Sequence, residues 1–302
     1  MKNTPFIAVT SQPVPYHADT TAIFNTLCKQ NSNSLLLDSA EIGSKNSLQS
    51  LILINAAVKI TCLGNQVTFR ALNANGKQVL NEIHPVLSQL GTVSAVNFDD
   101  EFSVQFAPLD NQLDEDSKLQ AATIFDGLRV ISNHYQHSST PVFLGGLFAY
   151  DLVANFIPMQ GVELKDDGIH CPDYSFYLAE NLITIDHQSQ QATLKSFCFS
   201  QEEQVEVAKT ALSIAQKLKN IDGVLSIKAA SDEVSTNFED PEFTGIVKAL
   251  KHHINIGDVF QIVPSRRFSL TCPNTLASYA QLKHNNPSPY MFYMNDEDFI
   301  LF

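Results

Sequence analysis

The sequence predicts an α+β fold in which mostly antiparallel strands are flanked by helices. Short apolar segments with strand-like composition follow one another, separated by turn-forming asparagine and glycine residues. Longer segments carry apolar residues at helical spacing. Hydrophobic residues make up 44% of the 302-residue chain and charged residues 17%, which is typical of a folded protein that can bury a substantial core.

The first part of the chain alternates between helices and groups of strands. Asp19 is a suitable N-cap for an amphipathic helix over residues 19–30. Turn signals at Asn55, Gly64-Asn65 and 73–76 divide the following stretch into separate strands. The predicted strands are 34–40, 47–54, 58–63, 67–72 and 93–106, and the predicted helices are 77–90 and 116–133.

The middle of the chain predicts a buried strand, a meander and a helix. Gly145 and Gly146 lie inside an apolar run, which indicates close backbone packing or a bulge. A turn at 179–181 separates the first two strands of the meander. The meander comprises residues 174–178, 182–186 and 192–199, and the helix follows at 202–219.

A change of composition predicts the domain boundary. Residues 220–239 are polar, small and weakly periodic, so we expect a linker between an N-terminal region, 1–219, and a second region, 240–302. Asp240-Pro241 marks a helix start that Gly257 ends, and a strand is expected over 259–270. The chain finishes on the apolar residues 299–302, where a terminal carboxylate would meet an unfinished core. We therefore expect a protein truncated at its C-terminus.

Charge and cysteine usage exclude several classes. A net charge of −13 argues against a nucleic-acid partner, and no apolar run is long enough to span a membrane. The five cysteines are scattered without a Cys-x-x-Cys pair, as in a cytoplasmic protein with reduced thiols. His252 and His253 are neighbours on a predicted helix and diverge by about 100°, so we expect no metal site there.

Two distant segments would form a pocket for an amino acid if they met. Residues 35–42 are an apolar strand that ends on Asp38 and Ser39, which suit the charged ends of a free amino acid. Residues 286–292 form a proline-stiffened loop with Pro289, Tyr290 and Met291, whose side chains suit a flat ring. Taken singly, each segment is equally consistent with a strand end and a rigid loop.

These segments closely resemble the tryptophan-sensing site of anthranilate synthase component I, in the chorismate-utilising enzyme family. Residues 35–42 are similar to that family's Leu-Leu-Glu-Ser-Ala segment, 143–151 to its Gly-Gly-x-x-x-Tyr-Asp segment, and 257–268 to the start of its chorismate-binding region. The resemblance runs from end to end in consistent order. It implies two packed, mostly antiparallel β-sheets flanked by helices, incomplete at the C-terminus.

The resemblance also implies site residues. Ser39, Pro289, Tyr290 and Met291 would contact feedback-inhibiting L-tryptophan, whereas Asp38 stands where the family usually has glutamate and is one methylene shorter. Gln261 occupies the position of a water-activating lysine in the related isochorismate and salicylate synthases. A neutral amide cannot act as such a base, which suits ammonia as the nucleophile. A glutamine that simply meets its neighbours in a strand is the alternative.

The implied activity is that of a lyase of tryptophan biosynthesis. The complete enzyme would convert chorismate and ammonia to anthranilate and pyruvate, with Mg²⁺ and with ammonia from a separate glutamine amidotransferase subunit. The later segments that bind chorismate and Mg²⁺ in the family are not in this sequence. Aminodeoxychorismate synthase component I is an alternative, although its usual Pro-Phe-Ser differs from residues 289–291. The second alternative is a non-catalytic fragment that binds tryptophan.

Overall fold

The described part of the chain forms two compact units. The computed structural model describes residues 5–29, 31–39, 48–97, 100–108, 112–136, 140–157, 171–221 and 233–302. Unit 1 is Met1–Val224 with Leu282–Phe302, and unit 2 is Leu225–Gln281. The predicted division at residues 220–239 stays a prediction, and most of that linker, like the end of the 35–42 segment, lies outside the described residues. No helix within the described ranges is both long and apolar enough to cross a membrane.

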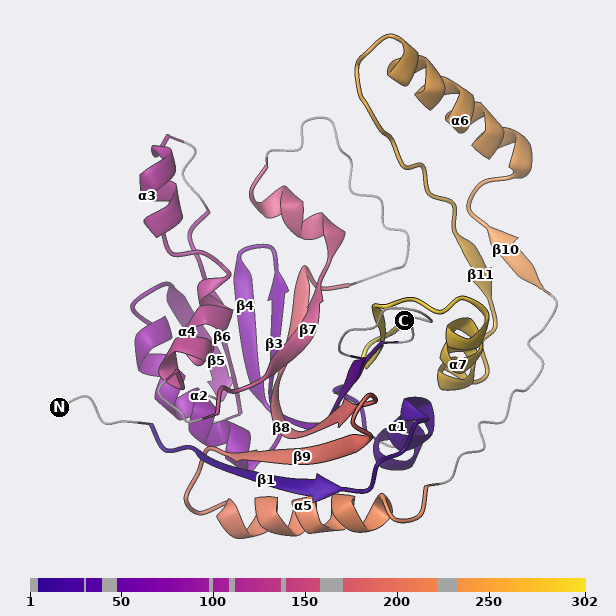
Figure 1. Cartoon of the computed structure of the whole chain (residues 1–302). Helices are drawn as coiled ribbons and strands as arrows, with labels where there is room; N and C mark the ends of the chain where they lie inside the picture. Colours follow the sequence, from indigo (N-terminus) through magenta and orange to yellow (C-terminus); the bar gives the residue numbers. More distant parts are fainter. Residues whose placement is uncertain are drawn as a thin grey trace. The chain divides into compact units, whose positions relative to one another are not determined.

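Unit 1 is built on one 11-stranded sheet in which every pair of neighbouring strands is antiparallel. Its main path runs β1-β9-β8-β3-β2-β12-β13, and β4, β5, β6 and β7 branch from it. Figure 1 shows β9 between β1 and β8. The strands are β1 (Ala8–Val14), β2 (Ser34–Asp38), β3 (Gln49–Leu63), β4 (Gln66–Ala71), β5 (Thr92–Asn97), β6 (Glu101–Gln105), β7 (Leu144–Phe148), β8 (Tyr174–Asp186), β9 (Gln191–Cys198), β12 (Met291–Asn295) and β13 (Ile300–Leu301).

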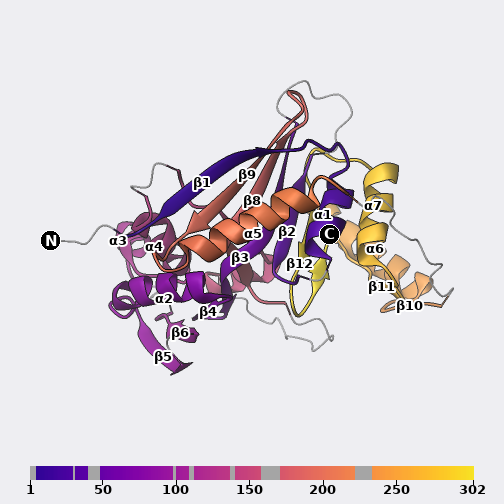
Figure 2. The same ribbon diagram turned by 90° about the horizontal axis from the view of Figure 1, so that it is seen from below.

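Helices cover one face of this sheet. Figure 2 shows α1 (Thr20–Cys28), α2 (Ala74–Leu87) and α5 (Gln204–Lys217) along the same side. The buried residues of α2 recur at helical spacing, from Val79 and Leu80 to Ile83 and Leu87. Asp19 caps α1 as predicted, because its carboxylate accepts hydrogen bonds from the backbone N–H groups of Thr21 and Ala22, both at 3.0 Å.

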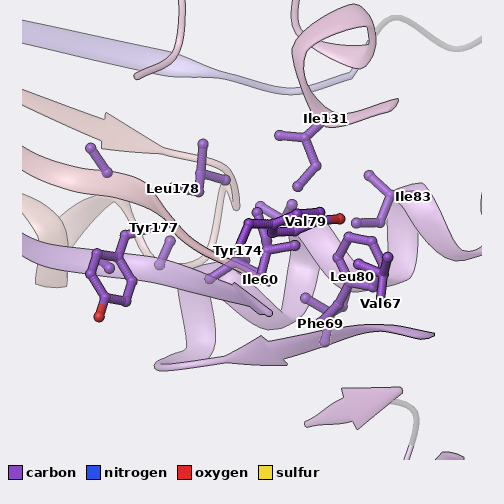
Figure 3. Packing of buried hydrophobic residues seen from close by; sticks show 14 of the residues in the cluster. Ile60, Val67, Phe69, Val79, Leu80, Ile83, Ile131, Tyr174, Tyr177 and Leu178 are labelled. Atoms are coloured by element: carbon purple, nitrogen blue, oxygen red, sulfur yellow. The ribbon is translucent and has the colours of Figure 1, made fainter. Parts of the chain in front are cut away.

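The core lies between this helical layer and the strands. Phe69 of β4, Tyr174 of β8 and Val79 of α2 are fully buried and belong to one cluster, seen at close range in Figure 3. The Tyr174 hydroxyl satisfies its hydrogen-bonding need by donating to the carbonyl of Ile124 at 2.7 Å. Burying each such large side chain stabilises the fold by about 1.5–3 kcal/mol.

Two predicted turns are instead continuous strand. The sequence predicts turns at Asn55 and at 179–181, but β3 and β8 run unbroken through both positions as strands of 15 and 13 residues. The two irregularities lie opposite each other, with Asn55 paired to Asn181 and Ala56 to Ala179. The polar side chains are therefore accommodated at a shared bulge, where the Asn181 amide donates to Asn55 Oδ1 at 3.4 Å.

Two predicted elements are each divided in the structure. The strand expected over 93–106 is the hairpin of β5 and β6, in which Val93 faces Val104. The helix expected over 116–133 is two helices, α3 (Glu115–Gln120) and α4 (Asp126–His134). Asp126 favours the start of α4, because its carboxylate accepts a hydrogen bond from the Thr123 N–H at 2.7 Å.

Unit 2 carries few buried side chains. Its helix α6 (Asp240–Asn255) begins with Pro241 in the first turn, and Glu239, not Asp240, stands at the N-cap. None of the described residues of helix α6 is buried. The strand predicted over 259–270 was wrong except at β11 (Phe268–Leu270), which pairs with β10 (Val234–Thr236). A strand needs a partner, and the described part of unit 2 offers only these three residues of β10. Helix α7 (Thr275–Asn285), which was not predicted, leads back to unit 1.

Candidate functional site

The two segments singled out in the sequence lie side by side in unit 1. Strand β12 pairs with β2 in an antiparallel ladder, and Met291 lies opposite Asp38. Ser39 follows Asp38 and Tyr290 precedes Met291, so these two residues lie just beyond the last pair of the ladder. The sheet therefore brings together the polar end of β2 and the proline-containing loop before β12.

The side chains at this place differ sharply in exposure. Tyr290 is 90% exposed, whereas Met291 is only 9% exposed and Ser39 is half-buried. Pro289 is exposed and precedes the aromatic ring. An open aromatic ring beside a partly buried hydroxyl and thioether is an arrangement that can receive a flat apolar group with a polar end.

Asp38 is tied to three other residues of unit 1. Its carboxylate accepts hydrogen bonds from Thr20 Oγ1 on α1 at 2.8 Å and from Ser50 Oγ on β3 at 2.7 Å, and it forms an ion pair with Lys283 Nζ on α7. Burial by itself raises the pKa of Asp38, but the charge of Lys283 and these hydrogen bonds lower it below its ordinary value. Asp38 is thus an ionised, buried anchor.

A polar chain continues from Asp38 toward the β8–β9 turn. Ser50 Oγ lies 2.9 Å from His187 Nε2, and the Tyr16 hydroxyl lies 3.3 Å from His187 Nδ1. Since the Ser50 hydroxyl donates to Asp38, its oxygen accepts from His187, which places the proton on Nε2. Burial lowers the pKa of His187 and so favours the neutral ring, in which Nδ1 accepts a hydrogen bond from the Tyr16 hydroxyl.

A second polar cluster lies in unit 1 around Asp296. Lys59 Nζ is 2.6 Å from Asp296 Oδ1, and the Tyr177 hydroxyl donates to the other carboxylate oxygen. A cavity of about 340 Å³ lies beside it, lined by Lys59, Thr61, Cys62, Leu63, Gln66, Thr68, Cys171, Pro172, Asp296, Asp298 and Phe299. Lys59 is paired with carboxylates on the cavity wall, so this cluster is first of all a buried ion pair.

The predicted catalytic residue, Gln261, belongs to the other unit. Gln261 belongs to unit 2, where it is exposed in the irregular segment before β11. No group of three or more His, Cys, Asp or Glu side chains is arranged to hold a metal ion in the described part of the chain.

Sequence reasoning missed the residues that hold the end of β2 in place. Three side chains bind the Asp38 carboxylate at the end of β2, those of Lys283, Thr20 and Ser50. His187 in turn contacts Ser50, and none of the four residues stands out in the sequence by spacing or motif. The single usable signal was the unexplained acid at the end of an apolar strand. A buried carboxylate requires a cationic or hydrogen-bonding partner somewhere in the chain.

Comparison with known proteins identifies a matching family and several similar proteins. The family pattern described as chorismate binding enzyme matches residues 80–302. Over 98% of the chain, 87% of residues are identical to anthranilate synthase component 1 of Haemophilus influenzae, and the protein of that name from Vibrio cholerae is 44% identical over the whole chain. The chain spans 57% and 58% of the lengths of these two relatives.

A solved structure supports the fold. The crystal structure of anthranilate synthase component I from Streptococcus pneumoniae superposes with a TM-score of 0.53 at 17% sequence identity, covering 86% of this chain and 50% of that chain. The predicted α+β class is confirmed, with one large antiparallel sheet, one small sheet and flanking helices.

Proposed function

Because this chain belongs to the family of chorismate-binding enzymes, we propose that it is the N-terminal part of the large subunit of anthranilate synthase. The observation that carries the proposal is the 87% identity to component 1 from Haemophilus influenzae over almost the whole chain. The complete enzyme converts chorismate and ammonia to anthranilate and pyruvate, a lyase reaction that opens tryptophan biosynthesis. We place it in the cytoplasm, in keeping with its scattered reduced cysteines.

The partners follow from the chemistry of the substrates. Ammonia comes from glutamine through a separate amidotransferase subunit, which accords with the component 1 name of the relatives. Mg²⁺, which would neutralise the carboxylates of chorismate, belongs to a part of the enzyme beyond this sequence. Gln261 contributes a neutral amide that can hydrogen-bond to substrate or ammonia without acting as a base.

Feedback inhibition by L-tryptophan is assigned to the β2–β12 site. Ser39 and nearby backbone groups bind the polar end of the amino acid, while Pro289, Tyr290 and Met291 contact the indole. Support comes from the antiparallel ladder that sets Met291 opposite Asp38 and from the open face of Tyr290. Asp38, whose oxygens already accept from protein groups, holds this frame together.

Product analysis of the native enzyme tests the proposed activity. The protein is purified from its own cells together with its partner, and chorismate is supplied with glutamine or with ammonium. We expect the ortho product, anthranilate, and pyruvate in equal amounts. A para-substituted product would identify aminodeoxychorismate synthase component I instead. Tryptophan binding without any turnover of chorismate would identify a non-catalytic binding protein, and either result contradicts the proposal.

A further inference from the structure

Lys283 lies at one end of the segment that forms the aromatic wall of the β2–β12 site. It occupies the last turn of α7, and the chain then runs through Pro287 and Pro289 to Tyr290. Its ammonium group donates to Thr20 Oγ1 at 2.9 Å and pairs with the Asp38 carboxylate. The start of the segment is thereby fixed to the end of β2.

The other end of the same segment is fixed to the same residue. Met291 begins β12 and is the backbone partner of Asp38 in the ladder with β2. Asp38 therefore holds residues 283–291 twice, through its side chain at Lys283 and through its main chain at Met291. The two prolines between these anchors restrict the backbone further.

The anchor itself is rigid. The Asp38 side chain is 1% exposed, and its second oxygen accepts from Ser50, which is in turn held by His187. A carboxylate with hydrogen bonds from two directions cannot rotate without losing one of them. Lys283 has a side chain that is 24% exposed and reaches this carboxylate from the surface.

We propose that Lys283 and Asp38 form a clamp that positions the 284–290 segment beside Ser39, so that Lys283 is a positioning residue of the amino-acid pocket. It acts without touching the ligand. This inference rests on the proposed assignment of the pocket to tryptophan. A clamped segment presents Tyr290 and Pro289 to the ligand already ordered, so binding does not have to order them.

Affinities of three ligands for variants of the native enzyme test the clamp. L-tryptophan, tryptamine, which lacks the carboxylate, and indole-3-propionate, which lacks the ammonium, are titrated by calorimetry. We expect Lys283→Met to weaken all three by a common factor of about tenfold, because the cost of ordering the segment does not depend on the ligand's charged ends. Lys283→Arg keeps the cation and should retain most of the affinity. Lys219→Met, at an exposed lysine, is the matched control and should match the unaltered enzyme.

A double variant separates positioning from general stability. Asp38→Asn with Lys283→Met removes both buried charges, so the unfolding midpoint should recover toward that of the unaltered enzyme while tryptophan affinity stays low. Affinity that recovers with stability would overturn the clamp. So would a loss confined to the two carboxylate-bearing ligands, which would make Lys283 a direct contact, or no loss at all. If the unaltered enzyme binds none of the three ligands, the tryptophan pocket itself is refuted and the clamp with it.

Discussion

Tyr290 is a large aromatic residue whose exposure folding does not explain. Its ring is 90% exposed, so Tyr290→Ala should change the free energy of unfolding by no more than about 0.5 kcal/mol. If the ring stacks on the indole of tryptophan, the variant should lose about 0.5–1.5 kcal/mol of binding free energy, which raises the inhibition constant by about two- to twelvefold. Inhibition curves and thermal unfolding measured on the same samples check both statements.

Tyr150 provides a matched control for this prediction. It is 91% exposed and lies in the 3₁₀ turn Tyr150–Asn155, away from β2 and β12 in sequence. Tyr150→Ala should leave tryptophan inhibition unchanged. Equal effects of the two substitutions on inhibition would remove Tyr290 from the pocket.

Lys59 and Asp296 show the opposite case, a pair that serves stability. Their side chains are 7% and 0% exposed, so Lys59→Met leaves a buried carboxylate uncompensated and should lower the free energy of unfolding by about 3–5 kcal/mol. The double variant Lys59→Met with Asp296→Asn removes both charges and should regain much of this loss. Urea unfolding at neutral pH of the unaltered protein, the single variant and the double variant measures the difference, and a double variant no more stable than Lys59→Met would contradict the pairing.

The same pair predicts a direction of pH dependence. Burial alone raises the pKa of Asp296, but the hydrogen bonds from Lys59 and Tyr177 lower it below its ordinary value. A folded-state pKa below the unfolded value of about 3.9 stabilises the protein above that pH, and the stabilisation is lost as the pH falls toward the folded value. The double variant should therefore lose less stability on acidification than the unaltered protein.

At the level of elements, the contact between α2 and β3 depends on one glycine. A Cβ atom on Gly76 would lie 1.9 Å from the carbonyl oxygen of Ala57, so the helix could not keep its place on the strand. Gly76→Ala should destabilise unit 1 by at least about 1–3 kcal/mol, although alanine is the better helix former. Calorimetric unfolding of the variant measures this.

Gly245 supplies the comparison within the same chain. It lies in α6, and a Cβ atom there would meet nothing within 4 Å. Gly245→Ala should therefore stabilise its helix by up to about 1 kcal/mol. Similar effects of the two substitutions would show that the close approach of α2 to the Ala57 carbonyl does not require glycine at position 76.

Elements set by local chemistry were predictable, and those set by distant partners were not. The cap at Asp19, the strand of β2 and the helix α5 follow from side chains within a few residues of one another. The bulge of β3 and β8 does not, because Asn55 and Asn181 resemble turn residues until they are seen to face each other. Likewise, the two segments of the proposed site stand out by their residue types, whereas the link from Lys283 to Asp38 joins residues 245 positions apart and has no local signal.

At the level of the whole molecule, the two units differ in how much side-chain surface they bury. The β3 and β8 strands are buried along most of their length, whereas α6 has no buried residue. In this 302-residue chain, amide hydrogens of α6 should therefore exchange with solvent much faster than those of β3 and β8. Hydrogen exchange followed by mass spectrometry resolves these segments. Comparable protection of α6 would show that its apolar stripe is covered.

The proposed tryptophan site of unit 1 can be tested directly because the given chain contains no tryptophan. Added L-tryptophan is then the sole indole in the sample, and its fluorescence anisotropy reports binding without interference from the protein. A saturable rise in anisotropy is predicted for the unaltered chain and for the control Ser213→Phe, at an exposed serine of α5. No rise is predicted for Ser39→Phe, because the ring would fill the polar end of the pocket. No rise with the unaltered chain, or an equal rise with Ser39→Phe, would contradict the assignment.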